Sequence, residues 1–485
     1  MLNELKEVFG ARYTDSPFER RFYSRDVAYL PEFLISLLSN PLPDMVFRPL
    51  NAEEVSRIIP FATVENLAVT PRAGASTALG NSVPTRGGIV LDLNALKGVV
   101  RFSASEEKVR VLPGTTWAEL DSYLRPRGYT VCAYPTSAFV ATIGGWFSVG
   151  GYGIGSIEHG PLVNQVSSLE VVLPSGEIRR LTQESEPPLQ WFAGTDGTLG
   201  VITELELKVR PVPEAMSHFL LVGKDPAGLI QAAQDCLAGM QGILHNLHYN
   251  SKAFNQALKS KGLVGSEPGN YHSLSVDLEG TRTQLDQGEA VLQSIVTRLG
   301  LRLLDSETAR EEWENRFQSL RVMRVHPCLL GGELLLPLNS LNQYLEQLEN
   351  LGRRAGVEML TYGHIVSPDK VLVMSLYPAD ERRTFRYLCD TSLIMEIYRL
   401  GIKLDGVPYL VGFWNTPYVK DIYNSERLAE LKRRKTLLDP KGIMNPSKAY
   451  RPPLLLRPAL FTLGMKTLGM VRQIFTKEAN RHEQQ

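Results

Sequence analysis

The first half of the chain alternates short apolar runs with segments whose apolar residues recur at helical spacing. Residues 52–66 have helical periodicity, whereas the flanking segments 46–50 and 67–74 are short and strand-like. The alternation continues to an apolar, alternating strand at 203–213. Strands joined by a helix in this order predict α/β units.

The second half has a different pattern, in which longer helical segments are separated by single strands. The helices expected here are 226–239, 283–300 and 338–355, and the clearest strands are 271–280 and 370–378. We therefore predict a second, α+β domain that begins near Pro213. The whole pattern divides the chain into an N-terminal helical segment 1–44, a first domain 45–214, a second domain 215–422, a basic helical segment 423–452 and a tail 453–485.

The tail contains an amphipathic helix at 458–477. Its apolar residues lie on one broad helical face and its polar residues opposite; they are Leu460, Leu463, Leu468, Val471, Ile474 and Phe475 against Lys466, Gln473 and Lys477. Such a basic helix suits a membrane surface, its own protein or a partner subunit, and docking on protein is slightly favoured.

Composition narrows the class of protein. Fifty-two basic residues balance fifty-two acidic ones, which argues against a nucleic-acid partner. The four cysteines are far apart and form no CxxC pair, as expected in a reducing compartment. The charged N-terminus and the lack of a long apolar run predict neither a signal peptide nor a membrane span. We expect a cytoplasmic protein, with peripheral contact at the inner face of a membrane through the tail left open.

Three glycine-rich loops are the main candidates for ligand binding. Residues 142–160 hold seven glycines in nineteen positions, and loops at 71–77 and 193–202 each adjoin a strand. Glycines allow backbone N–H groups to approach a flat or anionic ligand, although each loop alone also suits an ordinary tight turn.

Together these loops resemble a known family. PRAGAST, ATIGG followed by VSSLEVVLPSGEI, GTDGTLGVITELELKV and the terminal LLDPKGIMNPSK are similar to four ordered signatures of the vanillyl-alcohol oxidase/PCMH family of FAD-binding oxidoreductases. The resemblance is strongest to the glycolate oxidase subunit and D-lactate dehydrogenase branch. It implies an α+β fold: a PCMH-type FAD-binding domain of two α/β subdomains at 45–214, an α+β substrate or cap domain, and a C-terminal segment that returns to close over the flavin.

The resemblance also implies which residues hold FAD. They are Arg72, Ala73, Gly74, Ala75, Ser76, Thr77, Pro135, Thr136, Thr142, Gly144, Gly145, Gly151, Gly197, Gly200, Ile202 and Asn445. Some relatives attach the flavin through a histidine in the first loop. Ser76 stands in that place here, so we expect noncovalent FAD; a link through the loop residue His159 is the less favoured alternative.

Catalytic residues are less clearly marked. His364 is the best base, because a neutral imidazole can take the hydroxyl proton, although a structural strand histidine is equally compatible with the pattern. Arg316 and Arg321, with Arg324 nearby, resemble the branch's arginine-bearing segment and suit a substrate carboxylate. Tyr152 is a further candidate beside the flavin.

No metal is expected. The branch carries a paired-histidine segment, whereas TYGHIVS offers His364 alone, without a second imidazole or an acidic neighbour. His245 and His248 have the three-residue spacing of a helical metal pair, but no carboxylate lies near them in the sequence.

The predicted function is FAD-dependent oxidation of a 2-hydroxy acid or related alcohol, by hydride transfer to flavin N5. The electrons would pass to a quinone, an electron-transfer protein or oxygen. Two alternatives stay open: reduction of a C=C bond in a lipid or sterol-like substrate, and a flavin-carrying electron-transfer subunit without its own substrate site.

Overall fold

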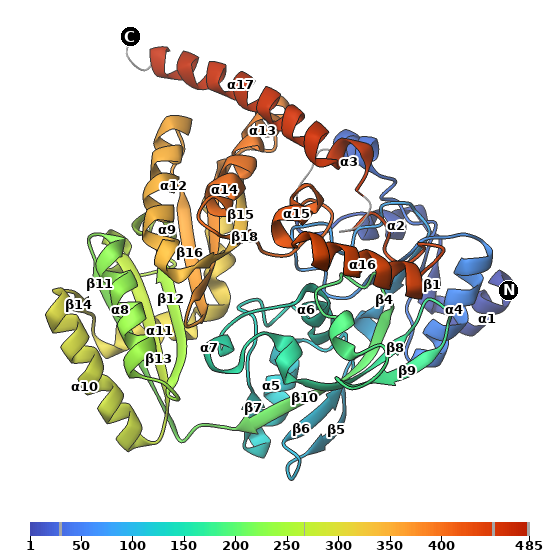
Figure 1. Ribbon diagram of the computed structural model, residues 1–485, viewed down its shortest axis with the longest axis horizontal. Coiled ribbons are helices and arrows are strands. Elements are labelled where there is room, and N and C mark those ends of the chain that lie inside the picture. The colour runs from blue at the N-terminus through green and yellow to red at the C-terminus, as the bar shows by residue number, and fades with distance from the viewer. Residues whose placement is uncertain (29–31, 266, 449–451, 483–485) are drawn as a thin grey trace. The chain divides into compact units, whose positions relative to one another are not determined.

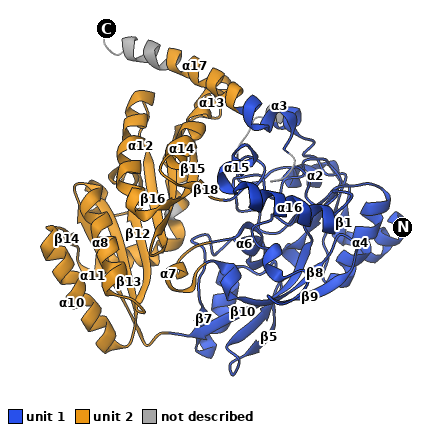
Figure 2. Ribbon diagram, in the orientation of Figure 1, with its two compact units in different colours: residues 1–151, 161–212, 410–461 blue, residues 152–160, 213–409, 462–485 orange. Residues whose placement is uncertain are grey.

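The computed structural model describes residues 1–28, 32–265, 267–448 and 452–482. The chain forms two compact units, which Figure 2 colours separately. Unit 1 comprises residues 1–151, 161–212 and 410–461, and unit 2 comprises residues 152–160, 213–409 and 462–485. The division follows Val212 and Tyr409, whereas the sequence pattern places the corresponding boundaries after residues 214 and 422.

Unit 1 contains two sheets. In the first, parallel strands β2, β4 and β3 follow the edge strand β1, in the order β1-β2-β4-β3. The second is antiparallel, in the order β5-β6-β10-β8-β9, with β7 also paired to β10. The strands are β1 Tyr13–Thr14, β2 Met45–Phe47, β3 Val69–Arg72, β4 Ile89–Asp92, β5 Val99–Ser103, β6 Lys108–Val111, β7 Tyr129–Val131, β8 Val166–Val172, β9 Ile178–Leu181 and β10 Val201–Pro211.

The helices of unit 1 come from both ends of its sequence (Figure 1). They are α1 Leu2–Phe9, α2 Pro17–Tyr23, α3 Glu32–Leu38, α4 Ala52–Val64, α5 Trp117–Leu124, α6 Ile143–Val149, α15 Val419–Ile422 and α16 Ser425–Leu438. Helix α4 begins where the Asn51 side chain accepts a hydrogen bond from the Glu54 N–H, and it buries its apolar face. The expected strand-helix-strand unit at 46–74 is confirmed as β2, α4 and β3.

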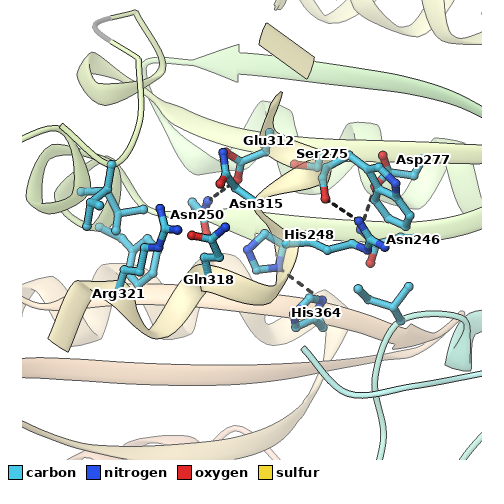
Figure 3. Close-up of a pocket in the computed structure, with 16 residues that line it drawn as sticks. Asn246, His248, Asn250, Ser275, Asp277, Glu312, Asn315, Gln318, Arg321 and His364 are labelled. Carbon is cyan, nitrogen blue, oxygen red and sulfur yellow. Dashed lines mark hydrogen bonds between the residues drawn. The ribbon is translucent and has the colours of Figure 1, made fainter. Parts of the chain in front are cut away.

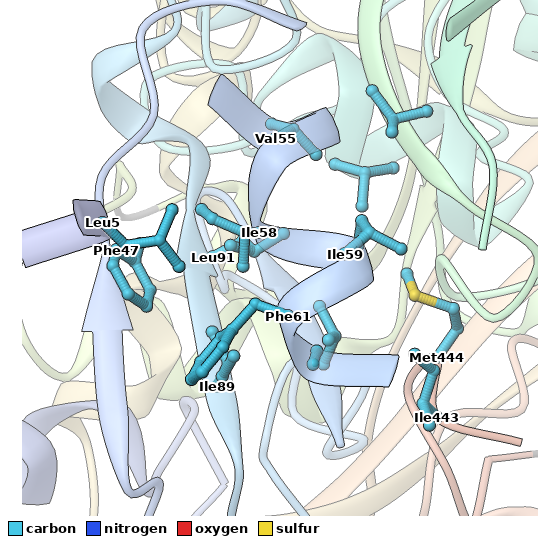
Figure 4. Close-up of a cluster of buried hydrophobic side chains, with 14 of the residues drawn as sticks. Leu5, Phe47, Val55, Ile58, Ile59, Phe61, Ile89, Leu91, Ile443 and Met444 are labelled. Atoms are coloured by element: carbon cyan, nitrogen blue, oxygen red, sulfur yellow. The ribbon is translucent and has the colours of Figure 1, made fainter. Parts of the chain in front are cut away.

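The core of unit 1 joins residues that are far apart in sequence. Apolar side chains of α4, β2 and β4 pack with Ile443 and Met444 of the C-terminal segment (Figure 4). Both of these C-terminal residues are at most 2% exposed. The burial of this apolar pair fixes the segment that follows it, which contains Asn445.

Unit 2 is built on one eight-stranded antiparallel sheet, in the order β14-β11-β13-β12-β16-β17-β15-β18. The strands are β11 Ala215–Gly223, β12 Leu244–Asn250, β13 His272–Gly280, β14 Arg302–Leu303, β15 Cys328–Pro337, β16 Leu360–Ser367, β17 Lys370–Ala379 and β18 Val407–Pro408. The helices are α7 Ser156–His159, α8 Pro226–Gly239, α9 Lys252–Lys259, α10 Arg282–Leu299, α11 Ser306–Glu314, α12 Leu341–Ala355, α13 Thr384–Asp390 and α14 Ser392–Ile402. The second-half helices and strands expected from the sequence are confirmed to within three residues at each end.

The tail forms helix α17, Pro458–His482. Most of this helix belongs to unit 2, where Arg472 is 3% exposed. Arg472 donates from Nε to Asp390 Oδ1 (2.8 Å) and also donates to the Ala355 carbonyl (2.7 Å). Leu463 and Ile474, from the expected apolar face, are 63% and 57% exposed. The side chains of Phe475 and Lys477, and residues 449–451 and 483–485, lie outside the described part.

Contact of the apolar face of α17 with a membrane or a partner subunit stays a prediction. Within the described residues, no helix is both long and apolar enough to span a bilayer.

Candidate functional site

Asn445 ties the C-terminal segment to the first sheet of unit 1. The Val69 N–H donates to the Ile443 carbonyl and the Asn445 N–H donates to the Val69 carbonyl, both at 2.8 Å, so this segment continues the sheet beside β3. Asn445 has φ +37°, a conformation that asparagine tolerates better than most residues. Asn445 is thereby held beside the start of β3.

The Asn445 side chain links the loop after β3 to the predicted FAD loop before β10. Its Nδ2 donates to the Asn81 carbonyl (2.8 Å) and to the Asp196 carbonyl (2.6 Å). Asn445 is 1% exposed, and its Oδ1 has no hydrogen-bond partner among the described residues. The structure therefore brings together the loop after β3, the loop before β10 and the C-terminal motif.

The first loop also approaches the second one closely. A Cβ added at Gly74 would lie 2.3 Å from the Val140 carbonyl oxygen and 3.3 Å from Thr142 Cγ2, so only glycine fits there. Thr142 begins α6, and its hydroxyl accepts a hydrogen bond from the Gly145 N–H (3.3 Å). Ala75 has φ +46°. The two loops predicted to hold one pyrophosphate thus lie in contact.

Other glycines of the stretch at 142–160 have a structural reason. A Cβ at Gly144 would lie 2.4 Å from Pro113 Cβ, and one at Gly151 would lie 2.1 Å from Trp146 Nε1. Within the described residues the side-chain space at these two positions is filled by protein. Close packing of the chain on itself therefore requires glycine at positions 144 and 151, whether or not a ligand lies nearby.

The remaining predicted FAD residues lie around the same loops. Arg72 is buried and donates to the Arg25 carbonyl (2.7 Å), and Thr77 Oγ1 donates to Asn81 Oδ1 (2.7 Å). Gly197 has φ +67°, and a Cβ added there would lie 3.2 Å from Pro71 Cγ. Three further predicted residues are partly buried, namely Ala73, Ser76 and Thr136. Pro135 and Ile202 are buried, the latter in β10, and a Cβ added at Gly200 would lie 2.8 Å from Val171 Cγ2.

A buried group of charges lies among these loops. Lys448 is 1% exposed and donates to the Val83 carbonyl (2.8 Å); burial lowers its pKa to about 7, against the opposing influence of Asp196 and Asp26. Asp196 accepts hydrogen bonds from Asn81 Nδ2 (2.7 Å) and the Gly412 N–H (3.1 Å), and burial raises its pKa to about 6. These side chains were not among the predicted site residues.

Unit 2 contains a separate polar pocket (Figure 3), with a cavity volume of about 40 Å³. Its walls are β12, β13 and β16 of the sheet, α9, α11 and the 3₁₀ segment Arg316–Arg324. Three of the predicted catalytic residues line it, namely His364, Arg316 and Arg321. Arg324 is exposed and does not line it.

Two histidines face each other in this pocket. His248 and His364 are direct partners across β12 and β16, and their Nδ1 atoms are 3.3 Å apart. They are 8% and 7% exposed. Burial lowers the pKa of His248 to about 4; burial, and then the neighbouring His248, lower the pKa of His364 well below its usual value. Both imidazoles are therefore neutral near pH 7, and His364 Nε2 has no hydrogen-bond partner among the described residues.

Acidic side chains and a stacked arginine complete the pocket. Asn250 Nδ2 donates to Glu312 Oε1 (3.3 Å). Glu312 is partly buried, and desolvation, followed by Asp277, raises the pKa of its carboxyl to about 7. The Arg316 guanidinium lies 4.1 Å from the centre of the Trp313 ring. This stacking restricts the position of the charged fork.

Tyr152 is not among the residues that line this pocket. It is half-buried, and its backbone N–H donates to the Tyr409 hydroxyl (2.8 Å). Within the described residues, no group of three or more His, Cys, Asp or Glu side chains is placed to hold a metal ion.

His245 and His248, whose spacing is that of a helical metal pair, lie on a strand, because LHNLHYN forms β12. Asn246, His248 and Asn250 alternate along this strand and all line the pocket. The alternation of these polar residues at every second position of LHNLHYN could have indicated a strand with one polar face. Such a face usually lies in solvent, so the pattern alone does not indicate a buried pocket.

Two family models match the chain. One describes an FAD binding domain and matches residues 43–182, and the other describes the C-terminal domain of FAD linked oxidases and matches residues 213–449. The protein belongs to the FAD-linked oxidases. It is therefore an FAD-dependent oxidoreductase. The two matches confirm the family, the cofactor and the enzyme class that were expected from the four sequence motifs.

Relatives of this FAD-linked oxidase match it along nearly the whole chain. The glycolate oxidase subunit GlcD of Bacillus subtilis (strain 168) is 24% identical over 472 residues, covering 92% of this chain and 96% of the relative. The mitochondrial D-lactate dehydrogenase (cytochrome) of Arabidopsis thaliana is 24% identical over 478 residues, covering 93% and 80%.

Solved structures share the fold. P-cresol methylhydroxylase with substrate bound superposes with a TM-score of 0.78 at 14% identity, covering 93% of this chain and 96% of that one. 4-Ethylphenol oxidase from Gulosibacter chungangensis superposes with a TM-score of 0.75 at 16% identity, covering 94% of this chain and 97% of that one. The expected α+β fold with a PCMH-type FAD-binding domain is thereby confirmed.

The residues of unit 1 fit FAD. Asn445 Oδ1 and Ser82 Oγ are buried oxygens without a hydrogen-bond partner in the described part of the chain, and Ser82 follows Asn81, whose carbonyl accepts from Asn445 Nδ2. Loop N–H groups are suited to an anionic pyrophosphate, whereas the Asn445 amide oxygen can only accept and suits an N–H or O–H donor of the cofactor. The individual contacts of the predicted FAD residues stay predictions.

Proposed function

We propose that this FAD-linked oxidase converts a 2-hydroxy acid to the corresponding 2-oxo acid. The observation that carries the proposal is the pocket of unit 2, which combines a buried neutral imidazole, His364, with the guanidinium groups of Arg316 and Arg321. Relatives named as a glycolate oxidase subunit and as D-lactate dehydrogenases support the same substrate class.

Arg316 and Arg321 would bind the substrate carboxylate. A guanidinium offers two parallel N–H donors, which match the two oxygens of a carboxylate. Arg316 is held by stacking on Trp313 and by its own hydrogen bond from Nη1 to the Trp313 carbonyl (2.9 Å). A positioned charge of this kind fixes the substrate at one end.

His364 would accept the proton of the substrate hydroxyl. Its pKa is lowered well below the usual value, so the ring is uncharged at pH 7 and able to take a proton, although the lower pKa also makes it a weaker base. As the hydroxyl proton moves to Nε2 and the hydrogen on the same carbon leaves as hydride, the C–O bond becomes a carbonyl. Bound FAD supplies the two-electron acceptor for that hydride.

The test is an anaerobic substrate screen. The purified, FAD-reconstituted protein is mixed with glycolate and with both enantiomers of lactate and 2-hydroxyglutarate, and the flavin absorbance is followed. We expect at least one of these acids to bleach the flavin, and readmission of oxygen, a quinone or an electron-transfer protein then identifies the acceptor. No bleaching by any 2-hydroxy acid would contradict the proposal and favour an electron-transfer subunit or a C=C reductase.

A substitution tests the role of the carboxylate site. Arg316→Met should raise KM for the active acid about 10-fold to 100-fold, because a charge-assisted hydrogen-bonded contact is worth about 1.5–3 kcal/mol. Arg324→Met, in the same segment but exposed, serves as the matched control and should leave KM unchanged. Equal KM values for the two variants would exclude Arg316 from carboxylate binding.

A further inference from the structure

We infer that the acid bound in the pocket of unit 2 carries a second hydroxyl group, which the side-chain amides of Asn250 and Gln318 bind. With the oxidised hydroxyl at C2 and the second one at C3, the substrate class is a short-chain 2,3-dihydroxy acid. The oxidation at C2 rests on the proposed function, whereas the binding of the second hydroxyl does not. Both amides line the same pocket (Figure 3).

The Asn250 amide is paired at its nitrogen and unpaired at its oxygen. Its Nδ2 donates to Glu312 Oε1 (3.3 Å), which directs the nitrogen toward α11. Asn250 is 2% exposed, and its Oδ1 has no hydrogen-bond partner among the described residues. Burying an amide oxygen without a donor is unfavourable, so we expect the molecule that occupies the pocket to supply an O–H or N–H group to it.

Gln318 offers a second buried amide oxygen to the same pocket. It belongs to the 3₁₀ segment Arg316–Arg324, and its Oε1 is also buried without a partner in the described part of the chain. Figure 3 shows Asn250 and Gln318 at the same end of the pocket. In that view His364 lies beyond His248, so the two amides form a binding position separate from the base.

A hydroxyl group matches this position better than an ammonium group does. A hydroxyl donates to an amide oxygen and also accepts from an amide N–H, so it pairs with the Gln318 amide in either orientation. An ammonium group only donates. Glu312 would attract it, but the guanidinium groups of Arg316 and Arg321 line the same pocket and repel it.

The size of the pocket limits the length of the acid. A cavity of about 40 Å³ holds on the order of three water-sized groups. This space suits a chain of about three carbons better than a long aliphatic or aromatic acid. The shortest acid with hydroxyls at both C2 and C3 is glycerate, which differs from lactate only by the hydroxyl at C3.

The binding position is tested first without a 2-hydroxyl. Propanoate and 3-hydroxypropanoate have the same length, and both lack the group that the proposed reaction oxidises. In calorimetric titrations of the full-length protein reconstituted with FAD, 3-hydroxypropanoate should bind about 10-fold to 100-fold more tightly. Equal affinities would overturn the inference, and tighter binding of 3-aminopropanoate than of 3-hydroxypropanoate would replace the hydroxyl by an ammonium group.

The kinetic test compares glycerate with lactate of the same configuration. In anaerobic flavin reduction, kcat/KM should be about 10-fold to 100-fold higher for glycerate, because a site built to hydrogen-bond a hydroxyl rejects the analogue that lacks it. Asn250→Leu and Gln318→Leu should each lower this ratio about 10-fold. General damage to unit 2 lowers both rates and leaves the ratio unchanged, so a wild-type ratio in both variants would overturn the assignment of these amides.

Two control variants change amides outside the pocket wall. Asn255 is 1% exposed and donates to the Tyr271 carbonyl (3.0 Å) and to Ser273 Oγ (2.9 Å), and Gln256 is exposed on α9. Asn255→Leu and Gln256→Leu should keep the wild-type ratio of glycerate to lactate.

The two experiments separate this inference from the proposed function. If no 2-hydroxy acid bleached the flavin while 3-hydroxypropanoate still bound more tightly than propanoate, the proposed function would fail and the hydroxyl position would stand. If lactate and glycerate bleached the flavin with equal kcat/KM, the inference would fail and the proposed function would stand.

Discussion

Burial, more than pairing of opposite charges, sets the protonation of the side chains that line the pocket of unit 2. It lowers the pKa of His248 to about 4 and raises that of Glu312 to about 7, so near neutral pH the imidazole is uncharged and the carboxyl is half-protonated. A neutral histidine pair beside arginines is suited to receiving a proton from an anionic substrate. Because the pKa of Glu312 is raised in the folded protein, its ionisation should make the free energy of unfolding depend on pH.

Glu312→Gln should change how stability depends on pH. The carboxyl has a usual pKa of 4.5 and a folded value of about 7, so between these values the unfolded chain loses its proton and the folded chain keeps it. The free energy of unfolding of the wild type should therefore fall, relative to the variant, by about 2–3 kcal/mol as pH rises from 4.5 to 8.

Chemical denaturation across this pH range measures the difference. The glutamine introduced by Glu312→Gln can still accept the Asn250 hydrogen bond, so the comparison isolates the ionisation. The exposed neighbour Glu314 gives the control, since Glu314→Gln should show no such trend. A pH-independent difference between wild type and Glu312→Gln would show that the carboxyl titrates normally.

At the scale of elements, the C-terminal segment is the part of unit 1 that joins its loops. Ile443 and Met444 are buried in the core, and the next residue, Asn445, bonds the loops of Asn81 and Asp196. The segment comes more than 200 residues after the last strand of unit 1, so its place depends on long-range packing.

Asn445→Leu should weaken FAD binding as well as stability. Loss of two hydrogen bonds to buried carbonyls should cost about 2–3 kcal/mol in the free energy of unfolding. We also expect loss of FAD during gel filtration, read from the flavin-to-protein absorbance ratio. The control Asn424→Ala, at the start of α16 in the same segment, should cost about 1 kcal/mol and retain the flavin. Full flavin retention by Asn445→Leu would remove the segment from the cofactor site.

Elements differed in how far their sequence revealed them. The strands and helices with strong periodicity, such as α8 and β13, were predicted well, because apolar burial on one face fixes their type. The polar strand β12 was not, since Asn246, His248 and Asn250 gain their burial from α11 and the 3₁₀ segment above them. Propensity and period carry no information on such tertiary cover.

At the scale of the whole molecule, the two units contain different parts of the proposed chemistry. The loops of unit 1 that are predicted to hold FAD were recognised from sequence because each is a short local motif and their order resembles that of the family. The pocket of unit 2 is assembled from segments between Ile154 and His364, and its pair Asn250 and Glu312 is separated by 62 residues. His364 and Arg316 were predicted singly, whereas their common pocket required the fold.

The most direct test of the account is the rate of flavin reduction in His364→Gln. In anaerobic stopped-flow experiments with the best 2-hydroxy acid from the screen, this variant should bind FAD normally yet bleach it about 100-fold more slowly than wild type. His326→Gln, which changes a histidine outside the pocket, should reduce at the wild-type rate. Equal rates for His364→Gln and wild type would contradict the assignment of His364 as the base in the pocket of unit 2.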